Sequence, residues 1–212
     1  MPLAEAERTT APVEAQPVRK LSSRERMLSA AAALFCANGY FAVSVEDIAS
    51  AAGVSRMTFY RHFSGKAVLA IALFQDNVAR SLPRFLAITR HAPLTCEIVR
   101  AWLTDVFESD RESGQLLRVF IQANVADSGF TEAAQSLLGT IIMELGKAIP
   151  AFALDPDSPA DRKRWLEAWL LIYEILDQSN HAGRGAGVST DPLIIDILAD
   201  RFLRFIEPAP SI

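Results

Sequence analysis

Apolar residues recur at helical spacing through most of the chain that follows residue 20. The first series falls at intervals of three and four positions and comprises Met27, Leu28, Ala31, Leu34 and Phe35. Ser22 and Glu25 precede it at the spacing of a capping box, and Gly39 follows it as a helix stop. The pattern therefore predicts a first helix over residues 22–38.

Three further helix starts follow at short intervals, each marked by a serine. Ser44 is placed to cap a short helix that stops at Gly53, and Ser55 is placed to cap the next one. Ser64 is placed to cap a fourth helix, which we expect to end before Pro83 because proline breaks a helix interior. The first part of the chain is thus predicted to hold four helices in close succession.

Longer helical patterns fill the rest of the sequence. Five segments are predicted, over residues 95–110, 114–127, 131–148, 159–180 and 191–207. The last has Asp191 as its expected N-cap and Pro192 at its first helical position. No alternation with a period of two bounded by hairpin turns accompanies these segments, so the sequence predicts an all-α fold.

The helices are expected to divide into two domains behind an N-terminal tail. Residues 1–20 contain three prolines and no apolar periodicity, so we expect them to be disordered. Residues 21–66 are predicted to form a small three-helix domain, and residues 67–212 a larger helical domain.

The distribution of charge changes what the total suggests. The chain has 212 residues, 22% of them charged, and a net charge of −4, which by itself argues against a nucleic-acid partner. Residues 19–66, however, hold seven Lys and Arg against three Asp and Glu, a net +4 that leaves −8 on the remainder. A basic first third joined to an acidic body favours nucleic-acid binding by the first third.

Residues 48–55 have the pattern of a helix, a tight turn and a second helix. Ala49 is small enough for two helices to cross closely, Gly53 allows a positive φ, and Val54 can seal the crossing. The second helix would then present a cation, hydrogen-bonding groups and apolar groups to a DNA major groove, through Ser55, Arg56, Met57, Thr58 and Tyr60. The segment therefore predicts a helix-turn-helix.

The same stretch carries a resemblance to a known family. From Ala31 to Leu69 the chain resembles the DNA-binding domain of the TetR family of bacterial transcriptional regulators. The residues that carry the resemblance are Phe35, Gly39, Tyr40, Ser44, Ile48, Ala49, Gly53, Val54, Ser55, Phe59, Tyr60, His62, Phe63 and Lys66. It implies a homodimer that binds double-stranded operator DNA and leaves it when a small-molecule effector binds the second domain.

The expected DNA contacts fall into three groups. Those that the resemblance implies at phosphates, or in fixing the recognition helix, are Ser44, Tyr60, His62 and Lys66. Those that it implies at base edges are Arg56, Met57 and Thr58. Arg19 and Lys20 precede the first helix and are expected to form an arm along the backbone or minor groove. An ordinary solvated surface remains the alternative for each of them.

The larger domain is expected to hold an apolar pocket with a few polar contacts, the usual composition of a small-molecule site. The expected ligand contacts are Phe74, Trp102, Phe120, Asn124, Met143 and Tyr173. Packing in the core is the alternative for each of them.

Two late helices carry wide apolar stripes, and we expect them to pair with their symmetry mates in a four-helix dimer interface. The expected interface residues are Trp165, Trp169, Ile172, Leu176, Leu193, Ile194, Ile197, Leu198, Phe202 and Phe205. In the alternative, both stripes close the core of a single protomer.

The chain has no sequence signature of an enzyme. It contains no phosphate-cradling glycine loop, nucleophile elbow or HExxH helix, and its histidines and cysteines lack metal-ligand spacing. We therefore expect no catalytic residue, no metal and no cofactor in a cytoplasmic protein without a membrane span. The sequence predicts a ligand-responsive DNA-binding repressor. An apolar-ligand carrier or enzyme with a merely structural helix-turn-helix is the alternative.

Overall fold

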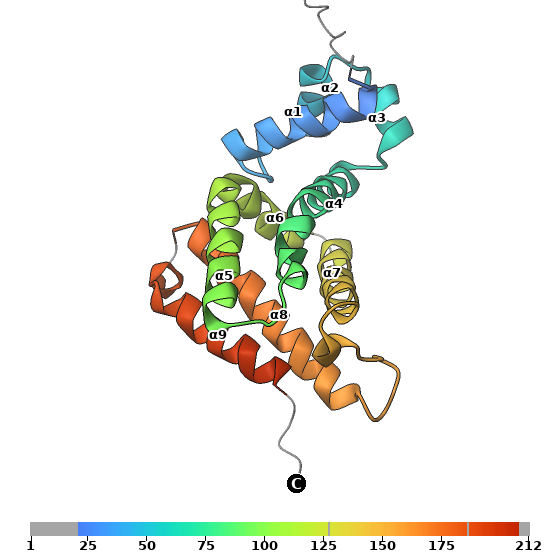
Figure 1. The fold of residues 1–212 in the computed structure, drawn as a ribbon. Helices are drawn as coiled ribbons and strands as arrows, with labels where there is room; N and C mark the ends of the chain where they lie inside the picture. The colour runs from blue at the N-terminus through green and yellow to red at the C-terminus, as the bar shows by residue number, and fades with distance from the viewer. Residues whose placement is uncertain (1–20, 127, 186, 208–212) are drawn as a thin grey trace, which may run out of the picture.

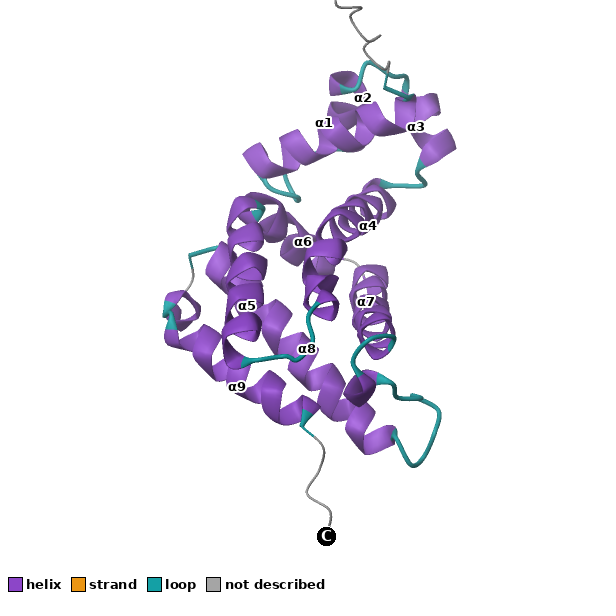
Figure 2. Cartoon of the chain, viewed as in Figure 1, coloured by secondary structure: helices purple, strands orange, loops and turns teal. Residues whose placement is uncertain are grey.

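The computed structural model describes residues 21–126, 128–185 and 187–207, and within these ranges the regular elements are all helices (Figure 2). The prediction of an all-α fold is therefore confirmed. The predicted tail, with Arg19 and Lys20 at its end, lies outside the described residues.

Three helices form one end of the molecule: α1 (Ser23–Asn38) and the two shorter helices α2 (Val45–Ala51) and α3 (Arg56–His62) (Figure 1). Each begins after the serine that the sequence predicts as its cap, namely Ser22, Ser44 and Ser55. In all three, the serine hydroxyl oxygen accepts the backbone N–H three residues further on, at 3.1–3.2 Å. These bonds satisfy amides that the first turn of a helix leaves unpaired.

Helix α4 (Lys66–Phe85) differs from its prediction in its cap and at its C-terminal end. It begins after Gly65 without a side-chain cap, so the expectation that Ser64 caps it is wrong. It also continues past Pro83, which lies inside its last turn. Phe85 explains this continuation, because its ring is buried in the core and its carbonyl accepts the indole N–H of Trp102 at 2.7 Å. Tertiary packing here outweighs the helix-breaking tendency of proline.

Five further helices and three short 3₁₀ segments complete the described chain. The helices are α5 (Cys96–Glu112), α6 (Gly114–Ala126), α7 (Ser128–Gly146), α8 (Arg162–Gly183) and α9 (Leu193–Ile206). The 3₁₀ segments are η1 (Leu86–Arg90), η2 (Pro150–Phe152) and η3 (Gly187–Thr190). Asp191 stands one residue before the cap position, which Pro192 occupies, yet its carboxylate accepts the N–H of Leu193 at 2.9 Å.

The side chains form two hydrophobic cores. One lies in the body, where α5 packs against α8 and α9, with Trp102, Phe107 and Phe202 among its buried rings. The other joins α1–α3 to the first half of α4 and to α6, and it includes both Phe59 and Phe120. Packing is therefore continuous across residue 66, where the sequence placed a domain boundary, and α4 and α6 connect the two ends of the molecule (Figure 1).

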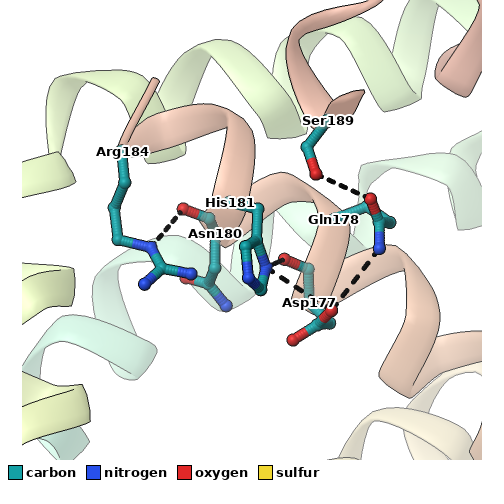
Figure 3. A network of polar contacts seen from close by, with 6 residues as sticks. All are labelled: Asp177, Gln178, Asn180, His181, Arg184 and Ser189. Carbon is teal, nitrogen blue, oxygen red and sulfur yellow. Dashed lines mark hydrogen bonds and ion pairs between the residues drawn. The ribbon is translucent and has the colours of Figure 1, made fainter. Parts of the chain in front are cut away.

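A network of polar contacts fixes the end of α8 to η3 (Figure 3). The hydroxyl of Ser189 donates to Gln178 Oε1 at 2.8 Å, and His181 Nδ1 lies 2.8 Å from the backbone oxygen of Asp177. The first of these contacts ties η3, in the connection between α8 and α9, to α8, whereas the second lies within α8.

Candidate nucleic-acid interface

Three features fix the turn between α2 and α3. Gly53 has φ = 63°, a conformation that favours glycine, and the N–H of Val54 donates to the carbonyl of Ala49 at 3.0 Å. From α1, Arg26 donates through Nε to the carbonyl of Ala52 at 3.0 Å. The tight turn that the sequence predicted is therefore held by one hydrogen bond within the turn and by a second one from α1.

The inner sides of α2 and α3 are sealed by apolar packing. Ile48 and Phe59 are fully buried, and Ala49 is nearly so, as the close crossing of two helices requires. Burial of these side chains leaves the opposite side of α3 to solvent.

The outward side of α3 carries most of the residues expected to contact DNA. Met57 is 84% exposed, and Arg56, Tyr60 and His62 are also exposed. Thr58 is half-buried, and its hydroxyl lies 2.9 Å from that of Ser55, the helix cap. The helix thus presents to solvent the apolar side chain of Met57, the aromatic hydroxyl of Tyr60 and the guanidinium of Arg56.

Arg56 is held from two directions. Its Nη1 lies 3.0 Å from Glu46 Oε1, on the first turn of α2, and its guanidinium carbon lies 5.6 Å from the centre of the Tyr60 ring. A hydrogen bond with Tyr60 and the negative charge of Glu46 raise the pKa of Arg56 above its ordinary value. The sequence reasoning missed Glu46, although acidic residues that follow an N-cap serine invite a search for a cationic partner.

Lys66 bonds within the protein. Its ammonium donates to the carbonyls of Tyr40 at 2.9 Å and Val43 at 2.8 Å, and it lies 4.4 Å from the centre of the Tyr40 ring. Partial burial lowers the pKa of Lys66. The roles expected for Lys66 were contact with a phosphate or fixing of the recognition helix, whereas these bonds anchor the first turn of α4 to the loop between α1 and α2.

Ser44 is also engaged within its own helix. Its hydroxyl donates to Asp47 Oδ2 at 2.6 Å, and its backbone N–H donates to the same oxygen at 2.9 Å. These hydrogen bonds lower the pKa of Asp47. Ser44 therefore fixes the start of α2, next to the surface formed by α3.

Two exposed arginines extend this surface beyond the expected residues. Arg61 lies in the last turn of α3, and Arg24 lies in the first turn of α1 with its guanidinium 5.7 Å from the Phe63 ring. Among the described residues, neither forms an ion pair with a carboxylate. Both arginines were counted in the net charge of residues 19–66, but no motif in the sequence assigned either of them to a site.

The six residues expected to enclose a ligand pocket do not come together. Phe74 and Phe120 pack with Phe130, in edge-on and tilted ring contacts, in the core shared with α1–α3, whereas Trp102 is buried in the body. Asn124, Met143 and Tyr173 are exposed on three different helices. The expectation of one pocket lined by these six residues is corrected accordingly, because their packing places them in separate environments.

A different set of residues lines a small cavity among α4, α5, α7 and α8. The cavity measures about 50 Å³, and its lining includes Leu82, Phe85, Val106, Ile141 and Leu176. Asp110 is its most deeply buried ionisable group, and it accepts a hydrogen bond from the hydroxyl of Ser179 at 2.6 Å. Burial raises the pKa of Asp110, and the bond from Ser179 partly offsets that rise.

The residues expected at the dimer interface fall into three classes of burial. Ile172, Leu198, Phe202 and Phe205 are buried in the core of a single protomer, which corrects their assignment to an interface. Leu193 and Ile197 are exposed, whereas the half-buried members are Trp165, Trp169, Leu176 and Ile194. Sequence reasoning missed Leu166 and Leu170, two exposed apolar side chains on α8, because the buried stripe of α8 has the stronger periodicity.

Two kinds of site are absent from the part of the chain that the structure describes. No group of three or more His, Cys, Asp or Glu side chains there is arranged to hold a metal ion. None of the helices in these ranges is both long and apolar enough to cross a membrane.

Comparison with known proteins agrees with this geometry. The sequence profile described as "Bacterial regulatory proteins, tetR family" matches residues 27–73, the stretch that holds most of α1 through the first part of α4. The chain is 29% identical over 127 residues to the HTH-type transcriptional activator FasR of Mycolicibacterium smegmatis, which covers 54% of this chain and 58% of FasR.

A second relative and a solved structure extend the comparison. The HTH-type transcriptional regulator UidR of Escherichia coli is 36% identical over 72 residues, or 34% of each chain. The matches thus span between about a third and three fifths of these two relatives. Salmonella enterica GusR has a similar fold, with a TM-score of 0.62 over 87% of this chain and 95% of GusR at 21% identity.

Proposed function

Because the chain belongs to the TetR family of bacterial regulatory proteins, we propose that it binds an inverted-repeat operator as a homodimer and releases it when a small-molecule effector binds. The observation that carries this proposal is the solvent-facing side of α3. Met57, Tyr60 and Arg61 project from a helix whose other side is locked by Phe59. A rigid helix with exposed donors, a cation and an apolar group suits readout of a major groove.

A pair of matched substitutions tests the proposed DNA surface. Met57→Asp places a negative charge at the centre of this surface, and we expect it to abolish binding to the DNA that flanks the gene of this protein. Val188→Asp makes the same change at a similarly exposed valine on η3, far along the chain, and should leave binding intact. Fluorescence anisotropy measures both variants. Equal binding by both would contradict the assignment of α3.

We extend the proposal to a dimer formed through α8 and α9. Leu166, Leu170 and Tyr173 are exposed and recur at helical intervals along α8, while Leu193 and Ile197 do the same on α9. Exposed apolar stripes of this kind are typical of surfaces that associate. An isologous interface also supplies the two-fold symmetry that an inverted repeat requires.

The dimer proposal is tested by changing exposed apolar residues to glutamate. Leu170→Glu, at a side chain that is 59% exposed, should dissociate the dimer, because a charge within an apolar interface is left unpaired. Val125→Glu, on α6, is the control at a valine that is 79% exposed. Sedimentation velocity gives the mass of each variant. A wild-type protein that sediments as a monomer would contradict the proposal.

The cavity beside Asp110 is our proposed effector site. It is bounded by α4, whose first half shares a core with α1–α3, so a ligand that enlarges the cavity must move α4 against the DNA-binding end. The two recognition helices must sit about 34–36 Å apart, or a multiple of it, to enter successive major grooves. A small change in that separation would release the operator.

A cavity-filling variant tests the effector site. Ile141→Trp should fill the present space of about 50 Å³ and make operator binding insensitive to compounds that release the wild-type protein. A screen of small molecules against the wild-type complex identifies those compounds. If they still release the variant with unchanged affinity, the effector site lies elsewhere.

We further propose that the protein acts in the cytoplasm as a repressor. A dimer that covers its operator blocks polymerase by occupancy alone. A reporter placed behind the flanking DNA should therefore rise in expression when the gene is deleted. A fall in expression would identify an activator instead, the activity named for FasR.

A further inference from the structure

Glu46 forms a contact that neither the helix caps nor the core require. It lies in the first turn of α2 and meets Arg56, the first residue of α3, across the tight turn. Its Oε1 is 3.0 Å from Arg56 Nη1, and the two side chains are 55% and 66% exposed. The contact therefore lies at the edge of the surface that we assign to DNA.

The chemistry of α2 separates Glu46 from its acidic neighbour. Asp47 accepts both the hydroxyl and the backbone N–H of Ser44, so its carboxylate belongs to the capping box. Glu46 has no part in that cap, and it forms an ion pair with the cation at the start of the next helix. A solvent-exposed ion pair contributes little to folding stability, so stability does not account for its position.

The ion pair restricts what Arg56 can reach. The Tyr60 ring lies 5.6 Å from the guanidinium on one side, and the Glu46 carboxylate engages Nη1 on another. A guanidinium has five N–H donors in a planar fork, so several donors remain available after this contact. An arginine without such a partner can contact the nearest phosphate, which carries no sequence information.

A carboxylate beside a DNA-binding surface also has an electrostatic effect. It repels phosphates and thereby weakens binding to every sequence alike. Arg24 and Arg61, which form no ion pair with any described carboxylate, remain available for phosphates. The surface thus contains arginines without a carboxylate partner, which are available for phosphates, and one arginine, Arg56, that is paired with Glu46.

We propose that Glu46 is a specificity-determining positioning residue that holds Arg56 away from the phosphates and directs its free N–H groups to a base edge. Guanine is the base that fits, because its O6 and N7 accept two parallel bonds from an arginine fork. This inference rests on the proposed DNA-binding function, and it assigns to Glu46 a role in sequence preference, distinct from a role in total affinity.

The test compares the sequences that variants of the full-length protein select from a random duplex library. Wild type should enrich a site with one strongly preferred base pair in each half-site, favoured by roughly fivefold to a hundredfold. Glu46→Gln should lose that preference, bind unselected DNA more tightly, and steepen the slope of log K against log salt by about 0.9 per half-site. Glu108→Gln removes the same charge from the exposed surface of α5 and should retain the wild-type profile.

A double-mutant comparison shows whether Glu46 acts through Arg56. Arg56→Ala should remove the preference at the same base pair, and adding Glu46→Gln to it should change the base profile no further. The inference would be overturned if Glu46→Gln kept the wild-type base preference. It would also be overturned if Glu46→Gln reduced base preference as much in the Arg56→Ala protein as in wild type. Either result would leave the DNA-binding function standing. Failure of the wild type to enrich any sequence would instead contradict the proposed function itself.

Discussion

The role of the Lys66 side chain follows from the two backbone carbonyls that accept its hydrogen bonds. Its ammonium joins the first turn of α4 to the carbonyls of Tyr40 and Val43, in the loop between α1 and α2. A buried carbonyl that loses such a donor is left unpaired, so the contact has a measurable effect on stability.

We predict that Lys66→Met destabilises the protein by about 1–3 kcal/mol, because it removes two charge-assisted hydrogen bonds and keeps the apolar stem. Lys163→Met is the control, since the Lys163 side chain is 91% exposed and lies 3.9 Å from its carboxylate partner. Urea denaturation measures both variants. Equal stability of the two would mean that the Lys66 bonds contribute nothing net.

Asp110 leads to a prediction about pH. Burial raises its pKa in the folded state, so the folded protein binds this proton more tightly than the unfolded chain does. Stability should therefore fall as the pH rises from 3.8, the ordinary value, through the folded pKa. Asp110→Asn keeps an acceptor for Ser179 but carries no charge, so it should melt at a higher temperature than wild type at pH 7.

The advantage of Asp110→Asn should shrink as the pH is lowered through the folded pKa of Asp110, below which wild type is also neutral at this position. Asp105→Asn, on the exposed side of the same helix, loses an ion pair with Arg84 and should show no gain at pH 7. Thermal melts at several pH values provide the comparison. A constant difference between Asp110→Asn and wild type at all pH values would contradict the account.

At the scale of elements, two glycines illustrate how backbone conformation alone determines the effect of a substitution. A Cβ at Gly53 or at Gly65 would meet no atom within 4 Å. Gly53, however, has φ = 63°, whereas Gly65 has φ = −179°, an extended conformation that any residue adopts. The cost of a side chain at Gly53 must therefore come from the backbone and cannot come from a clash.

We predict that Gly53→Ala destabilises the helix-turn-helix by about 1–2 kcal/mol, the cost of a left-handed conformation for an L-residue. Gly65→Ala should be neutral or slightly stabilising, because it restricts the unfolded chain without straining the folded one. Differential scanning calorimetry distinguishes them. If both alanine variants melt together, the turn between α2 and α3 relaxes more readily than its φ indicates.

The sequence predicted elements well where the signal is local. The serine caps of α1–α3 lie beside the residues that they cap, so the spacing of Ser22 and Glu25 is sufficient to place a helix start. The C-terminal end of helix α4 was misplaced because its last turn depends on the packing of Phe85 with Trp102, which lies 17 residues further along the chain. The contact of Glu46 with Arg56 likewise depends on the turn geometry and could not be obtained from spacing.

At the scale of the whole molecule, periodicity cannot distinguish a core from an interface. Phe202 and Ile197 both belong to the apolar stripe of α9, yet the first is fully buried and the second is 48% exposed. The cavity beside Asp110 was missed for the same reason, since Ile141 and Asp110 come to line one space only when α5 and α7 both pack against α4 and α8. Distances between helices, which a one-dimensional pattern does not contain, decide both questions.

The two ends of the molecule are joined by a hydrogen bond between distant residues. The backbone N–H of Tyr40 donates to Gln122 Oε1, on α6, at 2.7 Å. The bond holds the loop between α1 and α2, which Lys66 also holds from α4. Movement of α4 or α6 would therefore displace this loop, which lies at the end of the molecule that we assign to DNA.

We predict that Gln122→Met exposes the Tyr40 amide to faster hydrogen exchange, since methionine has similar length but no strong acceptor. Operator binding without effector should persist, while release by effector should require higher concentrations because the link from α6 is lost. Gln178→Met removes a comparable acceptor in the network of Figure 3 and should leave the exchange of Tyr40 unchanged. Unchanged exchange in Gln122→Met would show that the bond is not formed in solution.

The most direct measurement of the central claim is the set of sequences that the wild-type protein selects from a random duplex library. If the outward side of α3 reads DNA in a two-fold dimer, the enriched site is an inverted repeat whose half-site centres lie one helical turn apart, about 34–36 Å, or a multiple of it. Enrichment of no sequence, or of a site without two-fold symmetry, would contradict the claim.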